Sequence, residues 1–351
     1  MNKTVEELPK TSDLKEDISN VRVVVPAYHA ENTLQVCIEA IFNSRDVENL
    51  KVVVVDNGGN EKYGSSLVEA YPATYLLCQE QASAAYARNC GTADFKNGVL
   101  VFIDADVEIE KDTIANLIHP ILKGEADATL GNYTSNNIED LNFFQQYKQL
   151  YISKVYARSD GLIKNDFWTA ICAIRADVFH NIGKFDSSYK GSGGEDTEFG
   201  IRLSQQNWRI LSVPTAKGKH LRYFDILKLI KNDFSKGICT MLLYLKKGRS
   251  FSNHRHAKGG DILAVFLAVN VGIIFLAMIF LNAGKYQIIS LLWFVILLSY
   301  FMARYELLSV FFRRNLGFIV KAIPLMYILD IVRSLSVVMA IGIFLLSRDD
   351  K

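Results

Sequence analysis

The chain has 351 residues, half of them apolar, and a formal net charge of +2. This length suffices for one sizeable domain with an appendage, and so small a charge argues against nucleic-acid binding. Residues 1–258 read as a water-soluble protein, whereas long apolar runs dominate residues 261–346. Residues 1–19 are charged and lack the apolar core of a signal peptide, so we expect a flexible tail there.

Short β-branched runs alternate with helical patterns in the first third of the chain. We expect strands at 21–26, 51–55, 74–77 and 98–103, and helices at 33–43, 64–71, 82–93 and 112–123. This alternation predicts an α/β fold, a mostly parallel sheet with helices on both faces. Such sheets bind ligands beyond the carboxyl ends of their strands.

Three of the expected strands end in polar or turn residues, which should converge on one edge of the sheet. These ends are Pro26–Tyr28, Asp56–Gly59 and Asp104–Asp106. No G-x-G-x-x-G or Walker pattern follows the first strand, which argues against a nicotinamide dehydrogenase or an ATPase.

Asp104 and Asp106 flank a single alanine just after an apolar strand. In an extended chain both carboxylates point the same way and Ala105 points the other way. Two hard oxygen ligands at this spacing suit Mg²⁺ or Mn²⁺ bridged to a substrate diphosphate. The alternative is a solvated acidic turn.

A second acidic cluster, Glu195 and Asp196, follows a glycine-rich segment, 191–194, and opens an amphipathic helix at 196–207. Acids favour a helix N-terminus, so simple capping is one explanation. Capping does not require the preceding glycines, which permit a tight loop. A carboxylate at this junction can act as the base that takes a proton from an acceptor hydroxyl.

Two basic residues are further candidates. Arg88, on the third helix, can steady a donor diphosphate or be a surface charge. His220 lies in the basic stretch 217–222 and can be a third metal ligand, a diphosphate contact or a surface histidine.

Five cysteines are scattered without a C-x-x-C pair. This pattern predicts reduced, buried thiols rather than a disulfide framework. They are Cys37, Cys78, Cys90, Cys172 and Cys239.

Three apolar segments predict membrane helices, at about 262–281, 286–303 and 323–346. The first two form a hairpin. The third carries Asp330 and Arg333, one helical turn apart, so an in-plane or half-inserted helix is the alternative. A basic segment, 223–260, precedes them and is expected to be a juxtamembrane or interfacial helix region, and residues 347–351 a short tail.

Basic residues set the expected orientation. Residues 217–258 contain eleven Lys or Arg and two acids. The positive-inside rule therefore places the N-terminal domain in the cytoplasm of a multi-pass membrane protein, and we expect a bacterial or archaeal cell membrane.

The motifs, taken in order, resemble family 2 glycosyltransferases of the glycosyltransferase A fold. They are VVVPAYHAENTL at 23–34, VVVVDNGG at 52–59, AAYARNCG at 84–91, VFIDADV at 101–107 and GGEDTEFGIRL at 193–203. The resemblance covers about residues 20–222, the expected catalytic nucleotide-sugar transferase domain.

The resemblance implies a role for each matching position. Pro26, Ala27, Tyr28 and Glu31 would line the nucleotide pocket, and Asp56 would contact the base. Asp104 and Asp106 would hold the metal and the donor's ribose and diphosphate. Asp196 would be the general base and Glu195 would orient the acceptor, with transfer by direct displacement and inversion.

Two departures from the family pattern stand out. Asn57 replaces a frequent second Asp, which puts a ribose contact in doubt. No Q-x-x-R-W motif is present, which favours one sugar per acceptor over polymerisation.

The resulting prediction is a metal-dependent hexosyl- or N-acetylhexosaminyl-transferase that uses a nucleotide-diphosphate sugar. Its expected acceptor is a lipid-linked intermediate of a cell-surface polysaccharide. The alternatives are transfer to polyprenyl phosphate, a nucleotidyltransferase and a catalytically silent membrane scaffold. A nucleotidyltransferase usually needs a Gly-rich loop after the first strand, and none is present.

Overall fold

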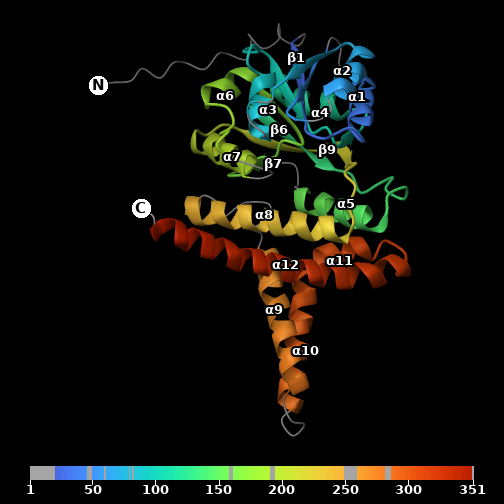
Figure 1. Ribbon diagram of the computed structural model, residues 1–351, viewed down its shortest axis with the longest axis vertical. Helices are drawn as coiled ribbons and strands as arrows, with labels where there is room; N and C mark the ends of the chain where they lie inside the picture. Colours follow the sequence, from blue (N-terminus) through green and yellow to red (C-terminus); the bar gives the residue numbers. More distant parts are fainter. Residues whose placement is uncertain are drawn as a thin grey trace. The chain divides into compact units, whose positions relative to one another are not determined.

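The computed structural model describes residues 20–45, 50–58, 61–78, 80, 83–157, 161–189, 194–248, 259–280 and 286–349. The chain divides into two compact units (Figure 1). The sheet unit comprises Met1–Thr134 and Arg158–Arg222, and the helical unit comprises Ser135–Ala157 and Tyr223–Lys351. The predicted tail at 1–19 and the glycines at 191–193 lie outside the described residues.

The described strands of the sheet unit form one mixed sheet, in the order β3-β2-β1-β4-β8-β6-β9-β5, with β7 also paired to β9. The strands are β1 (Val21–Ala27), β2 (Lys51–Asp56), β3 (Ala73–Leu77), β4 (Val99–Ile103), β5 (Val107–Ile109), β6 (Ala128–Tyr133), β7 (Gly161–Ile163), β8 (Ile171–Arg175) and β9 (Ile210–His220).

Parallel pairing, predicted for most of the sheet, holds from β3 to β4 and again between β6 and β9. The other pairs, β4–β8, β6–β8, β5–β9 and β7–β9, are antiparallel. The sheet is therefore mixed, because β8 runs antiparallel to both β4 and β6, and β5 and β7 run antiparallel to β9. The strands β1, β2 and β4 are almost wholly buried, which is why they read as continuous β-branched runs rather than as alternating ones.

Helices of the sheet unit connect or follow these strands. They are α1 (Leu34–Phe42), α2 (Glu61–Glu69), α3 (Ala84–Gly91), α4 (Thr113–Leu122), α6 (Ala176–Asn181) and α7 (Glu195–Gln205). Helix α3 lies directly on the sheet: a Cβ at Gly91 would come 2.6 Å from a methyl group of Val24. The last turn of this helix therefore packs against β1 and β2, through Val24 and Val55.

The helical unit consists of α5 (Phe143–Tyr156), α8 (Ile226–Lys247), α9 (Gly259–Phe280), α10 (Tyr286–Ala303), α11 (Tyr305–Phe311) and α12 (Leu316–Asp349). Among the described residues two helices are long and apolar enough to cross a membrane, 260–280 and 316–347. The chain bends by 69° between α10 and α11, and together they make a third candidate. Helices α9 and α10 form a hairpin, and α12 runs across its base (Figure 1).

Helix α5 comes between two strands of the sheet unit in the sequence, yet it groups with the C-terminal helices. The expected catalytic domain, residues 20–222, included this helix. Its Tyr147 and Tyr151 are buried in the helical unit. The Lys148 ammonium also donates to the Asp233 carboxylate on α8, 2.8 Å away. Such a long-range partner leaves no local sequence signal.

Candidate active site

The carboxyl end of β2 places Asp56 in a buried position. One oxygen of its carboxylate accepts a hydrogen bond from the Gly58 backbone N–H at 2.9 Å. The other accepts from the Tyr75 hydroxyl at 2.6 Å, across the neighbouring strand β3. Asp56 is therefore held in one orientation, and Tyr75 is a residue of this site that the sequence did not single out.

The loop after β1 meets the loop after β2 at Gly58. The Tyr28 side chain is exposed, with 59% of the residue accessible, and its ring lies where a Cβ at Gly58 would come within 3.1 Å. Ala27 is buried, whereas Pro26 and Glu31 are half-buried. The first two predicted strand ends thus come together, with an exposed aromatic face beside Asp56.

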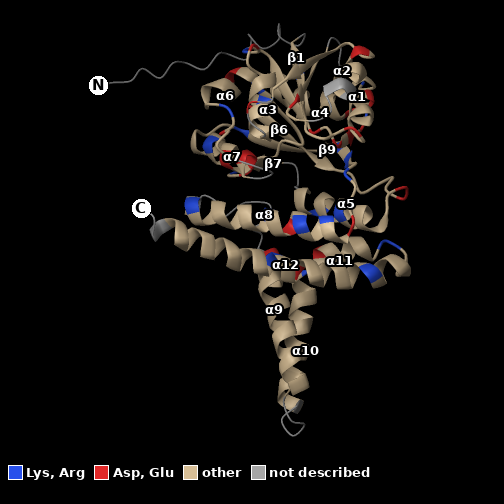
Figure 2. Cartoon of the chain, viewed as in Figure 1, with Lys and Arg blue, Asp and Glu red and all other residues tan. Residues whose placement is uncertain are grey.

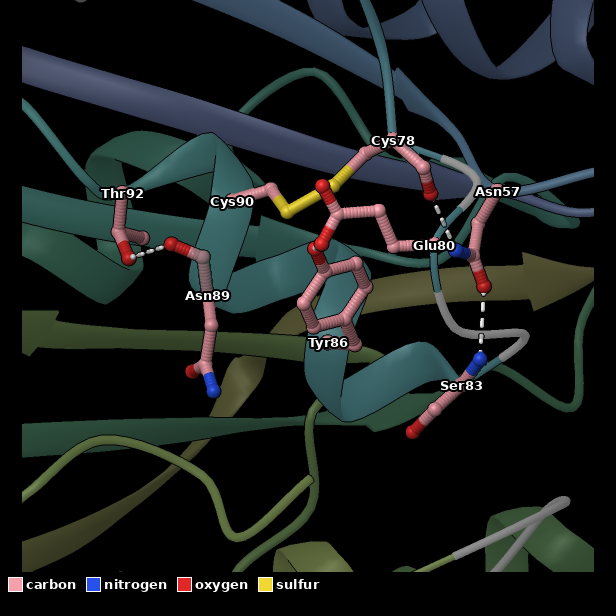
Figure 3. Close-up of a disulfide and its surroundings, with 8 residues drawn as sticks. All are labelled: Asn57, Cys78, Glu80, Ser83, Tyr86, Asn89, Cys90 and Thr92. Carbon is pink, nitrogen blue, oxygen red and sulfur yellow. Dashed lines mark hydrogen bonds between the residues drawn. A yellow bond between two sulfur atoms is a disulfide. The ribbon is translucent and has the colours of Figure 1, made fainter. Parts of the chain in front are cut away.

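Asn57 joins three elements (Figure 3). Its side-chain amide donates to the Cys78 carbonyl at 2.5 Å, and its side-chain oxygen accepts from the Ser83 backbone N–H at 2.8 Å. A carboxylate has no hydrogen to donate to a carbonyl. The Asn at this position therefore ties β2 to the end of β3 and the start of α3, which an Asp could not do.

The structure corrects the prediction that all five cysteines are reduced. Cys78, just after β3, forms a disulfide with Cys90 on α3 (Figure 3). Cys37 and Cys172 are buried thiols, as predicted, and Cys239 is a half-buried thiol outside the disulfide. Scattered spacing could not reveal the pair, because the two cysteines meet only after α3 packs against the sheet.

The third strand end carries Asp104 and Asp106. Both are half-buried while Ala105 between them is buried. The segment is a turn, in which the Val107 N–H donates to the Asp104 carbonyl at 3.0 Å, and not the extended chain that the alternation argument assumed. The Asp106 carboxylate lies 3.6 Å from His220 Nε2, at the end of β9. Strands β5 and β9 pair so that Val107 faces His220, and this register brings the two residues together across more than 100 positions of sequence.

The side chains at this strand end supply only some of the ligands that a divalent cation needs. No group of three or more His, Cys, Asp or Glu side chains is arranged to hold a metal ion within the described ranges. Asp106 and His220 supply a carboxylate and an imidazole side by side, and Mn²⁺ accepts both kinds of ligand. Asp104, the other predicted ligand, has an arginine partner. The residues present therefore fit a metal whose remaining ligands come from a bound diphosphate or water.

Arg88 is buried, with 3% of the residue exposed, which excludes the surface-charge alternative. One guanidinium nitrogen donates to the Asp104 carboxylate at 2.6 Å, and another donates to the Glu195 carboxylate at 3.4 Å. Arg88 thus links the acid after β4 to the acid that opens α7. The sequence marked these residues as candidates separately but did not predict that they meet.

Glu195 and Asp196 differ in environment although they are adjacent. Glu195 is buried, and one of its oxygens, Oε2, has no hydrogen-bond partner. Burial, with the nearby Asp196 charge, raises the pKa of Glu195 to about 6, although Arg88 opposes the shift. Asp196 is half-buried, and one of its oxygens accepts a hydrogen bond from the Thr197 backbone N–H at 2.7 Å. Of the two, Asp196 is the better placed to reach a ligand.

Helix α7 is anchored tightly, which fixes both acids. Glu198 and Arg202 form an ion pair of 2.9 Å along one face of the helix. The Arg202 guanidinium also donates to the backbone carbonyls of Ile182 and Lys184, each at 2.6 Å. A Cβ at Gly200 would come within 2.5 Å of the backbone at Asp166, so the helix packs against that segment through a bare glycine.

The sequence profile of the family described as "Glycosyl transferase family 2" matches residues 22–183, and that described as "N-terminal domain of galactosyltransferase" matches residues 162–225. One curated relative is Glycosyltransferase GlyA of Streptococcus pneumoniae, 31% identical over 39% of this chain and 20% of its own length. Another is undecaprenyl-phosphate 4-deoxy-4-formamido-L-arabinose transferase of Pectobacterium atrosepticum. It is 26% identical over 46% of this chain and 51% of its own length.

A solved structure with a similar fold is mannosyltransferase PcManGT from Pyrobaculum calidifontis, in complex with GDP-Man and Mn²⁺. It superposes with a TM-score of 0.60 over 90% of this chain and 86% of the other, at 16% sequence identity. The chain spans one fifth and about half of the lengths of the two curated relatives. The similarity thus covers the sheet unit most consistently, and the solved structure extends the likeness in fold to most of the chain.

Proposed function

We propose that this chain, a member of glycosyl transferase family 2, moves one sugar from a nucleotide-diphosphate sugar to a lipid-linked, membrane-associated acceptor. The observation that supports this most is the Arg88 bridge. It joins Asp104, beside the expected diphosphate position, to the Glu195–Asp196 pair, where an acceptor hydroxyl would lose its proton. The residues expected near the donor diphosphate and those expected near the acceptor hydroxyl therefore contact the same buried guanidinium, that of Arg88.

The residues at the carboxyl ends of β1 and β2 would bind the nucleotide. The exposed Tyr28 ring offers a face on which a base can stack, and Asp56, held by Tyr75, offers a fixed carboxylate edge to the base. Pro26, Ala27 and Glu31 would line the rest of the nucleotide pocket. Asn57 would hold this pocket in place through its hydrogen bonds to Cys78 and Ser83 rather than by contacting the ribose.

Asp106 and His220 would hold Mg²⁺ or Mn²⁺, with Asp104 beside them, its carboxylate oriented by Arg88. When bound, such an ion neutralises the charge that grows on the departing diphosphate. A divalent metal is supported by the Mn²⁺ named with the structurally similar mannosyltransferase.

Asp196 would act as the base. Its carboxylate takes the proton from the acceptor hydroxyl while that oxygen attacks the anomeric carbon from the face opposite the leaving diphosphate. The bond to the diphosphate breaks as the new glycosidic bond forms, so the anomeric configuration inverts. Glu195, fixed by Arg88, would orient the acceptor and keep the base aligned.

The apolar helices support a membrane-bound acceptor, because an enzyme that carries its own membrane helices meets a lipid-linked substrate at the same surface. A second candidate is transfer to polyprenyl phosphate itself, which is supported by the likeness to an undecaprenyl-phosphate transferase. The basic composition of residues 217–258 supports a cytoplasmic active site in both cases.

The test is release of nucleoside diphosphate by the detergent-purified chain. It is incubated with Mn²⁺ or Mg²⁺ and a panel of UDP-, GDP- and dTDP-sugars, with and without membrane lipid extract, beside Asp196→Asn. Release that needs one donor, metal and lipid extract, and that Asp196→Asn abolishes, is the expected result. Equal release with purified polyprenyl phosphate alone would favour the second candidate. Absence of donor binding by calorimetry would contradict both.

A further inference from the structure

A chain of buried charges runs through the helical unit. The Asp233 carboxylate accepts from both Lys148 and Arg333, and Asp330 pairs with both Arg333 and Arg304. Arg304 also pairs with Asp261. The side chains alternate in sign and come from α5, α8, α12, the α10–α11 bend and α9, in the order Lys148, Asp233, Arg333, Asp330, Arg304, Asp261.

This charge chain fixes α12 against α8. The Asp233–Arg333 pair joins the two helices directly, and Gly237 of α8 lies so close to Ser336 of α12 that a side chain at position 237 would overlap the serine hydroxyl. Helix α12 therefore occupies the same depth as α8 along their contact. Helix α8 is strongly basic, and its Lys228 and Lys231 are exposed. A helix with exposed lysines of this kind does not enter the hydrocarbon of a bilayer.

The charges of the helical unit end at the base of the α9–α10 hairpin. Figure 2 shows Lys, Arg, Asp and Glu in α5, α8, α11 and the middle of α12, whereas the two helices of the hairpin are uncharged below their base. The boundary between water and hydrocarbon is thus expected at this level, where α12 runs across the hairpin (Figure 1).

Helix α12 does not have the dimensions or polarity of a simple span. Its 34 residues make about 50 Å of helix, whereas the hydrocarbon core is about 30 Å thick. Crossing would carry Asp330 and Arg333 to mid-membrane together with their partners on α5 and α8. Even as ion pairs, charges at that depth are unfavourable.

The side of α12 that α8 leaves uncovered is apolar. Its exposed residues beyond the charged middle include Leu335, Val338, Met339, Leu345 and Leu346. A surface of this kind next to an apolar hairpin matches the interfacial layer of the bilayer that the hairpin enters.

We propose that α12 lies in the membrane interface and docks its uncovered apolar side onto the bilayer, so that the chain crosses the membrane only twice, through α9 and α10. The partner of this surface is the lipid bilayer itself. The end of α12 then lies on the same side of the membrane as α8, whereas three crossings would place it on the opposite side. This inference does not depend on the proposed transfer reaction.

Labelling of an introduced cysteine with a membrane-impermeant maleimide tests the topology in the full chain, in a Cys239→Ser background in which the remaining thiols, Cys37 and Cys172, are buried. Sealed inverted and right-side-out membrane vesicles are compared for Lys228→Cys on α8, Phe280→Cys at the far end of α9 and Ser347→Cys at the end of α12. All three positions are exposed. Lys228→Cys and Ser347→Cys should label in the same vesicles, and Phe280→Cys only in the other kind. Labelling of Ser347→Cys together with Phe280→Cys would overturn the inference, as would labelling of all three from one side.

A depth measurement provides a second test. Spin labels at Val320, Ile328, Leu335, Val338 and Leu346 are assayed in phosphatidylethanolamine–phosphatidylglycerol vesicles with lipid-borne relaxation agents. An in-plane α12 predicts similar, shallow depths for all five labels. A spanning helix predicts a progressive change of roughly 39 Å from Val320 to Leu346, since each residue advances about 1.5 Å, and that result would overturn the proposal.

Discussion

Replacing Arg88 with methionine tests the bridge at the centre of the site. The change keeps most of the volume but leaves the Asp104 and Glu195 carboxylates without their shared cation. Removing one partner of a buried ion pair costs about 3–5 kcal/mol. For a unit of this size each kcal/mol lowers the melting temperature by about 2–4 °C. We therefore expect a fall of roughly 10 °C at pH 8 in detergent.

The fall in melting temperature caused by Arg88→Met should be larger at high pH than at low pH. The pKa of Glu195 is raised to about 6 by burial, and Arg88 restrains that shift. Without Arg88 the pKa rises further, so ionised Glu195 destabilises the fold more at pH values above its pKa. Below about pH 4.5 the carboxyl is neutral in the folded and unfolded states alike, and this penalty disappears. The melting-temperature difference between Arg88→Met and the parent protein should be clearly smaller at pH 5 than at pH 8.

Differential scanning fluorimetry of the detergent-solubilised chain measures both values. The matched control is Arg88→Met with Glu195→Gln, which removes the uncompensated charge and should recover part of the loss at pH 8. An equal loss at pH 5 and pH 8, unrelieved by Glu195→Gln, would refute the reasoning. Arg88 would then contribute by packing rather than by charge.

Four other changes have defined outcomes. Asp196→Asn should lower nucleoside-diphosphate release by about 100-fold or more with an unchanged melting temperature; retained activity would remove Asp196 as the base. His220→Asn should raise the Mn²⁺ concentration needed for half-maximal donor binding by about tenfold, as measured by calorimetry, and an unchanged requirement would remove it from the metal site. Gly200→Ala should destabilise by about 1–3 kcal/mol, because its methyl group meets the backbone at Asp166; an unchanged melting temperature would contradict this packing. Cys78→Ser should destabilise the oxidised protein by about 2–4 kcal/mol, and the same melting temperature with and without reductant in the parent protein would argue against the disulfide.

Local features of the sequence predicted much of the sheet unit. The runs that became β1, β2 and β4 are β-branched because they are buried on both faces, so a continuous apolar pattern sufficed to find them. Asp104 and Asp106 are half-buried around a buried Ala105, as expected, but the three residues form a turn rather than the extended chain on which their predicted shared direction depended. The strands after residue 123, β6 to β9, were not predicted from the sequence, and they range in length from the three residues of β7 to the eleven of β9.

Contacts between distant residues could not be predicted in the same way. Arg88 and Glu195 are 107 positions apart, and Tyr75 reaches Asp56 only because β3 pairs with β2 in one particular register. The partner of Cys78 likewise depends on where α3 packs. Residue type indicated which side chains could take part, whereas the packing of α3 against the sheet and of α7 against the backbone at Asp166 decided which of them meet.

The most direct test of the proposed function is transfer itself. A donor that the panel identifies is labelled with ¹⁴C in its sugar and incubated with the purified chain, Mn²⁺ and membrane lipid extract, and the organic phase is then counted and the anomeric configuration of the product determined. We predict label in a lipid-extractable product with inverted configuration, absent with Asp196→Asn or with EDTA. Label that stays in the water phase as free sugar, or a product with retained configuration, would contradict direct transfer to a membrane acceptor by this site.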